Sequence, residues 1–131
     1  MNAFAVNSIL ITVLSIPLAI LIVLNARREK DRWLLGLFTF AVAVWGIGGF
    51  FIARTQDASE ALFYWRVTHV GVILIPSFLF HFVLLFLKKK NKPLILASYA
   101  FAVLFEITNA TGDLICCVRY VFGQFYYDSP P

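Results

Sequence analysis

Three ionisable residues, Arg66, His69 and Glu106, interrupt long apolar stretches of the sequence. Ionisable groups are costly in hydrocarbon, so those found within membrane-spanning segments commonly mark a functional site. At about 100° of rotation per residue, an arc of about 120° along one helix holds Arg66, His69, Ser77 and His81. A second arc, of about 80° along the next helix, holds Tyr99, Ala102, Glu106, Asn109 and Asp113. We expect the two arcs to face other helices and not lipid.

The two arcs predict a polar cluster between neighbouring helices. Arg66 and His69 lie near the start of one apolar stretch and Glu106 near the end of the next, so antiparallel packing places them at similar depth. We therefore expect an ion pair or hydrogen-bonded cluster that joins Glu106 to Arg66 or His69. In a second structural interpretation, Arg66 extends outward to water and Glu106 meets water at the interface. Both are preferred over a third interpretation, a ligand-sensing or proton-sensing role.

The remaining reactive side chains do not form a recognisable catalytic or metal-binding pattern. His69 and His81 are separated by about 18 Å along one helix and cannot share a haem iron, and His81 is interpreted as a helix-packing hydrogen bonder. Cys116 and Cys117 are adjacent, so they build neither a disulfide framework nor a zinc site. We interpret them as two small apolar residues in preference to an oxidisable pair, and their role stays open. No phosphate-binding loop or activated nucleophile is visible, so we expect no cofactor, no metal and no enzymatic activity.

The composition requires lipid as the solvent for most side chains. Of the 131 residues, 61% are hydrophobic and 14% are charged, whereas soluble domains average about 45–50% and about 25%. The apolar stretches predict an all-α integral membrane four-helix bundle with antiparallel neighbours, in a single domain spanning residues 1–131. The expected helices cover about 3–24, 33–53, 61–87 and 94–110. The first is read as an uncleaved helix because no Lys or Arg precedes it, unlike in a signal peptide.

Several residues predict how these helices pack and end. Small residues on one face allow close backbone approach, and the second helix carries such a stripe at Gly36, Thr39, Ala43 and Gly46. Pro76 should kink the third helix, which Asp57 or Ser59 should cap. The fourth helix, opened by Pro93, is the shortest, and we expect it to run nearly perpendicular to the membrane or to thin the bilayer. The outer segment 111–131 is expected to form a small hairpin around a Gly123-Gln124 turn, or to lie along the interface.

The positive charges predict the orientation. Eight of the eleven Lys and Arg residues lie in two short runs, 27–32 and 88–92, and basic loops face the cytoplasm. The other side holds Arg54, Arg66 and Arg119. Both termini are therefore expected outside, in a multi-pass membrane protein. The concentration of eight basic residues in two short runs also argues against a nucleic-acid partner.

A scattered set of residues resembles a known family. The set comprises Arg54-Thr-Gln, Ala61-Leu-Phe-Tyr-Trp-Arg66, Gly71, Ile75-Pro76, Phe80-His81-Phe82, Trp45-Gly46 and Tyr120-Val-Phe-Gly123. It is similar to the N-terminal seven-transmembrane region of bacterial sensor histidine kinases and related signalling proteins. That resemblance implies an input module in a bacterial cytoplasmic membrane, with its N-terminus outside, followed by a cytoplasmic output domain. Only the first four of the seven helices are present, which suggests a fragment, and no catalytic residue carries over.

Two functional hypotheses follow. The leading hypothesis is a non-enzymatic sensory or signal-input domain of a signal-transduction protein such as a histidine kinase. The alternative is a small homo-oligomeric transporter or channel that uses Glu106, Arg66 and His69 as a translocation site, although a coupling carboxylate is expected nearer the midplane. The expected partners are the lipid bilayer and either further copies of the chain or the missing helices and output domain of a longer protein.

Overall fold

The computed structural model describes residues 3–25, 30–89 and 91–128, which form four long helices followed by a hairpin. The helices are α1 (Ala3–Asn25), α2 (Lys30–Arg54), α3 (Ala58–Phe86) and α4 (Lys92–Thr111), and the strands are β1 (Cys117–Val121) and β2 (Gln124–Asp128). All four helices are long and apolar enough to cross a membrane. The predicted all-α membrane fold with a small hairpin near the C-terminus is confirmed.

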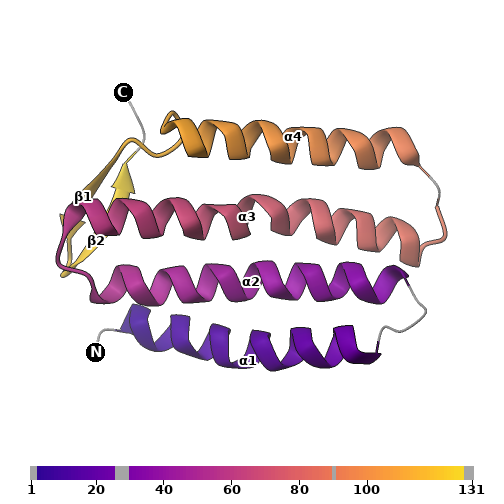
Figure 1. The fold of residues 1–131 in the computed structure, drawn as a ribbon, viewed down its shortest axis with the longest axis horizontal. Coiled ribbons are helices and arrows are strands. Elements are labelled where there is room, and N and C mark those ends of the chain that lie inside the picture. Colours follow the sequence, from indigo (N-terminus) through magenta and orange to yellow (C-terminus); the bar gives the residue numbers. More distant parts are fainter. Residues whose placement is uncertain (1–2, 26–29, 90, 129–131) are drawn as a thin grey trace.

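The four helices stand in chain order in an open row (Figure 1). In the described part of the chain, α2 packs between α1 and α3, and α4 packs only against α3. Successive helices run antiparallel, as expected from their short connections. Because the row does not close on itself, most large apolar side chains stay exposed on its faces, which suits a surrounding of lipid.

Side-chain caps mark the starts of α3 and α4, which begin three and two residues before the sequence-based bounds. The Asp57 carboxylate accepts hydrogen bonds from the backbone N–H groups of Ser59 and Glu60, so Asp57 is the N-cap of α3. The Asn91 side chain accepts from the Leu94 N–H at the start of α4. With 20 residues, α4 is about 30 Å long, which equals the thickness of a typical hydrocarbon core. The expected bounds 94–110 were therefore too short.

The predicted stripe of small residues lies in the interface between α1 and α2. Thr39 and Ala43 are buried, and a Cβ added to Gly46 would lie 2.5 Å from the Thr12 hydroxyl oxygen. A Cβ added to Gly36 would lie 2.7 Å from a methyl group of Val23. On α3, a Cβ at Gly71 would approach the backbone carbonyl oxygen of Ala41 on α2 to 2.5 Å. Glycine thus permits close backbone approach at both interfaces.

The hairpin is a two-residue turn between antiparallel strands in which Cys117 pairs with Asp128 and Val121 pairs with Gln124. Its turn is Phe122-Gly123, with φ of 52° and 81°, and not the expected Gly123-Gln124. A tight hairpin turn of this kind needs positive φ at both central positions, and glycine fits best at the second. Gln124 is therefore the first residue of β2, where it is buried.

The chain ends and the helix ends that flank the basic runs lie at opposite ends of the row. In Figure 1 the N-terminus, the C-terminus and the hairpin are at one end, and the other end holds the end of α1, the start of α2, the end of α3 and the start of α4. The basic runs belong to the α1–α2 and α3–α4 connections of the sequence, and Lys88, Lys89 and Lys92 are exposed. Arg27, Arg28 and Lys90 lie outside the described residues. α3 continues as a helix through Pro76, and the expected kink stays a prediction.

Candidate functional site

The hairpin is fastened to α3 by Trp65. The indole N–H of Trp65 donates to the Phe125 carbonyl oxygen at 3.0 Å, and the Tyr127 ring packs edge-on against the indole with centroids 4.9 Å apart. Trp65 also forms a small buried core with Ile52 of α2 and Ile115, which precedes β1. This contact combines a large buried apolar area with a directional hydrogen bond, so it holds the hairpin in one position over α2 and α3.

His69 lies one helical turn after Trp65 on α3 and belongs to the same contact. Its ring meets the Tyr127 ring edge-on, with centroids 5.0 Å apart, and its Nδ1 lies 2.8 Å from the Trp65 carbonyl oxygen. Because a carbonyl oxygen only accepts, this hydrogen bond requires the proton on Nδ1. His69 therefore faces the hairpin.

Arg66 joins three parts of the fold. Its Nη2 donates to the Ile115 carbonyl oxygen at 3.2 Å, and the same nitrogen lies against Gly112, the left-handed residue that ends α4. The backbone carbonyl oxygen of Arg66 accepts a hydrogen bond from Asn109 Nδ2 at 3.0 Å. The guanidinium thus extends toward the C-terminal end of α4, where the helix dipole favours a cation. Its backbone is tied to α4 at the same level.

Asn109 and Glu106 place unpartnered polar atoms beside this junction. Asn109 is only 3% exposed, and the Glu106 carboxyl lies against its side chain. Within the part of the chain that the structure describes, three buried side-chain atoms there have no hydrogen-bond partner, namely Arg66 Nε, Glu106 Oε1 and Asn109 Oδ1. Such groups cost free energy unless water or a ligand satisfies them. One donor and two acceptors are therefore available at the end of the α3–α4 contact that is nearest the hairpin.

The structure separates the residues of the expected cluster. Among the described side chains, no ion pair or hydrogen bond joins Glu106 to Arg66 or His69; Asn109 stands between Glu106 and Arg66 instead. Sequence reasoning placed Asn109 on the Glu106 arc but did not single it out. The residues that it missed are Trp65, Phe125 and Tyr127. The only sign of this contact in the sequence was the cluster of aromatic residues shortly before the end of the chain. The spacing of these residues could not show that they contact Trp65 on α3.

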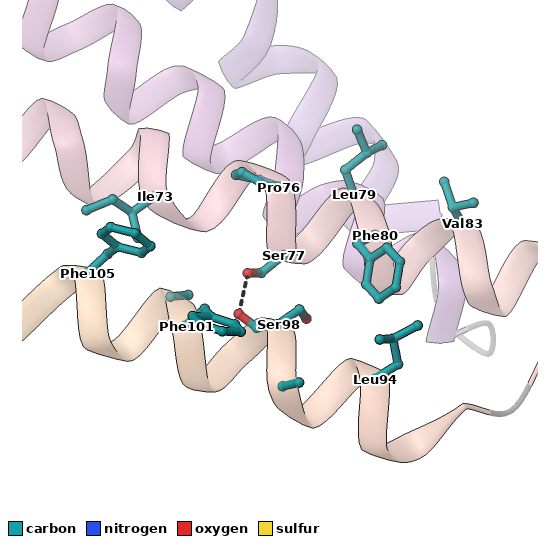
Figure 2. A pocket seen from close by; sticks show the side chains of 12 residues that line it. Ile73, Pro76, Ser77, Leu79, Phe80, Val83, Leu94, Ser98, Phe101 and Phe105 are labelled. Carbon is teal, nitrogen blue, oxygen red and sulfur yellow. Dashed lines mark hydrogen bonds between the residues drawn. The ribbon is translucent and has the colours of Figure 1, made fainter.

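Two further hydrogen bonds join α3 to α4 farther from the hairpin. The Ser77 hydroxyl donates to the Ser98 carbonyl oxygen at 3.1 Å, and His81 Nδ1 lies 3.1 Å from the Tyr99 hydroxyl. An apolar groove of about 780 Å³ runs between the two helices, and Figure 2 shows the Ser77–Ser98 bond crossing it among Phe80, Phe101 and other apolar side chains. The α3–α4 interface is thus held by polar bonds at intervals, with an open apolar groove between them.

These features form a structural junction between α3, α4 and the hairpin. Within the described residues, no group of three His, Cys, Asp or Glu side chains could hold a metal ion. The arrangement links a hairpin, a helix end and a helix pair through Arg66 and Asn109.

A family described as the N-terminal seven-transmembrane region of histidine kinase matches residues 8–128. The chain belongs to this family. The match includes the hairpin as well as the four helices, so the chain is a multi-pass membrane protein of a sensory type. No curated protein and no solved structure matches it.

Proposed function

We propose that this chain is the signal-input domain of a bacterial signal-transduction protein such as a histidine kinase. The observation that carries the proposal is the family match over residues 8–128, which includes every element of the candidate site. In this proposal the chain itself performs no catalysis. Its partners are lipid and either the further helices and output domain of a longer protein or other copies of the chain.

The proposed orientation puts the hairpin and both termini outside the cytoplasmic membrane. It rests on the two basic runs of the sequence. The helix ends that flank these runs, those of α1 with α2 and of α3 with α4, lie at the opposite end of the row from the hairpin (Figure 1). Anionic lipids of the inner leaflet would hold these runs by roughly 1 kcal/mol per basic residue near the surface. The hairpin then faces the side from which an external signal arrives.

Arg66 suggests how a signal could pass from the hairpin into the helices. Its side chain bonds the segment that leads into β1, and its carbonyl oxygen bonds Asn109 of α4. Movement of the hairpin would therefore act on α3 and α4 together. Because the α3–α4 interface contains an open groove, α4 can shift at less cost than a helix held by close packing on both sides.

The transporter alternative finds less support in the position of Glu106. This residue lies five positions before the end of α4 at Thr111, about 8 Å from the helix end, whereas coupling carboxylates are expected near the bilayer midplane. An input domain should show no proton flux that depends on this side chain. Purified chain in liposomes, compared with Glu106→Gln, measures that flux directly. Flux lost in the variant would replace our proposal with the transporter.

The DNA that follows codon 131 provides the second test. We expect it to encode three more apolar spans and a cytoplasmic kinase, cyclase or similar output domain, either in frame or after an interruption. Unrelated sequence there, together with Glu106-dependent flux, would refute the input-domain proposal.

A further inference from the structure

The two cysteines, which the candidate site does not use, lie with their sulfur atoms side by side. Cys116 Sγ and Cys117 Sγ are 2.8 Å apart, and both thiols are free. Cys117 is exposed and Cys116 is half-buried. A disulfide bond is about 2.05 Å long, so closing one requires the sulfur atoms to move by less than about 1 Å.

Their position at the start of β1 explains why adjacent side chains meet. Within a strand, successive side chains point to opposite faces, but Cys116 precedes the first residue of β1 and is outside that alternation. Both sulfur atoms approach the same acceptor, the Asp128 carbonyl oxygen, at 3.6 Å from Cys116 and 4.0 Å from Cys117. The base of the hairpin therefore gathers the two thiols on one side.

We propose that Cys116 and Cys117 form a redox-active dithiol that closes to a disulfide by exchange with a small disulfide compound. In the first step the Cys117 thiolate attacks the compound, forms a mixed disulfide and releases one thiol. In the second step the Cys116 thiolate attacks Cys117 Sγ, forms the Cys116–Cys117 bond and releases the second thiol. The two thiol protons leave with the two released thiols, the cysteines are oxidised and the compound is reduced.

The closed form should reopen readily. Adjacent Cα atoms are about 3.8 Å apart, which is less than the separation of about 4.4–6.8 Å found in ordinary disulfides. Constrained and exposed disulfides are more easily reduced, and these are the labile or regulatory ones. The pair is therefore suited to reversible oxidation and not to permanent cross-linking.

Oxidation would act on the hairpin and on Arg66. Once the disulfide forms, neither sulfur carries a hydrogen, so the Asp128 carbonyl oxygen loses both of its sulfur donors. The peptide between the cysteines is also restrained, directly after Ile115, whose carbonyl oxygen accepts from Arg66. Ile115 itself is fully buried. The dithiol is therefore placed to change the hairpin base and the Arg66 junction, which goes beyond the proposed input function and does not depend on it.

The groups around Cys117 predict when the reaction is fast. The hydrogen bond with the Cys116 thiol raises the pKa of Cys117 above its usual value, burial and Asp128 add to this, and Arg119 lowers it. Only the thiolate attacks. The exchange should therefore be slower near neutral pH than for an unperturbed cysteine and accelerate as the solution becomes alkaline.

The test treats the purified full chain in detergent with oxidised glutathione and maps the products by mass spectrometry of the peptide that contains both cysteines. We expect an intramolecular product that is lighter than the reduced peptide by two hydrogen atoms and that returns to the dithiol form with a mild reductant. Cys116→Ser and Cys117→Ser should each stop at the mixed disulfide. A wild-type chain that accumulates mixed disulfides or intermolecular dimers would overturn the proposal.

A second measurement tests the structural consequence. Amide hydrogen exchange in β1 and β2 should increase severalfold when the wild-type chain is oxidised, and it should not change when Cys116→Ser is treated in the same way. Protection of the β1 and β2 amides in each reduced variant reports whether its hairpin is still packed. Exchange that is identical in the oxidised and reduced chains would overturn the coupling to the hairpin.

Discussion

Replacement of Trp65 by Phe tests whether this residue holds the hairpin on the helices. Trp65 is 8% exposed, and its indole N–H bonds the Phe125 carbonyl oxygen at 3.0 Å. Phe retains an aromatic ring but has no donor. Loss of one hydrogen bond costs about 1 kcal/mol, and up to about 3 kcal/mol when the buried acceptor finds no other partner. We therefore expect hairpin opening to become easier by a factor of about 5 to 150.

Amide hydrogen exchange of the detergent-solubilised chain measures this opening residue by residue. The amides of β1 and β2 should exchange faster by that factor, and amides in the middle of α1 should be unaffected. Trp45→Phe is the matched control, because Trp45 is 42% exposed on α2. If Trp65→Phe and Trp45→Phe change hairpin exchange equally, Trp65 does not anchor the hairpin and the coupling through Arg66 loses its basis.

Three further predictions concern the helix interfaces, the dithiol and a helix cap. Gly71→Ala should destabilise the α2–α3 interface by about 1–3 kcal/mol, because the added Cβ meets a backbone carbonyl oxygen. Thermal unfolding in detergent should show a smaller loss of stability for Gly36→Ala, because the added methyl group there meets only the end of a side chain. Equal losses of stability in the two variants would contradict this. Cys116→Ala removes the hydrogen bond that is the largest cause of the raised pKa of Cys117. Cys117 should therefore be alkylated faster at neutral pH than in the wild-type chain. Slower alkylation would refute the pairing of the thiols. The hydrogen bonds from Ser59 and from the Glu60 backbone N–H lower the pKa of Asp57 in the folded chain. The cap should therefore be fully present above the pKa of Asp57 in the unfolded chain and be lost only as pH falls through the lower pKa of the folded chain. An NMR titration of the capped amides with a midpoint at or above pH 3.8 would contradict this.

The number and approximate extent of the helices could be predicted because membrane spans are a property of local composition. Each apolar run must be long enough to cross the hydrocarbon core, and backbone groups within it must bond internally. The ends of the helices were predicted less accurately, because a helix cap depends on a single side chain. For α4, Asn91 adds two residues before the expected start and brings the helix to full span.

The candidate site was predicted only in part. Helical spacing placed Arg66, His69, Glu106 and Asn109 toward the contact between α3 and α4. It could not reveal that the Arg66 guanidinium bonds Ile115 and that His69 meets Tyr127. These partners are about 50 residues or more away along the chain, and spacing along one helix carries no information about such distant contacts.

The sequence by itself determined the solvent of this protein, its number of membrane spans and the two basic connections, because each of these follows from the character of neighbouring residues. The tertiary structure alone decided that the helices form an open row, that Phe122 and Gly123 make the turn and that Asn109 comes between Glu106 and Arg66. The physical reason is that lipid supplies little preference for one apolar face over another. Close glycine contacts and a few buried hydrogen bonds between distant residues therefore choose the arrangement.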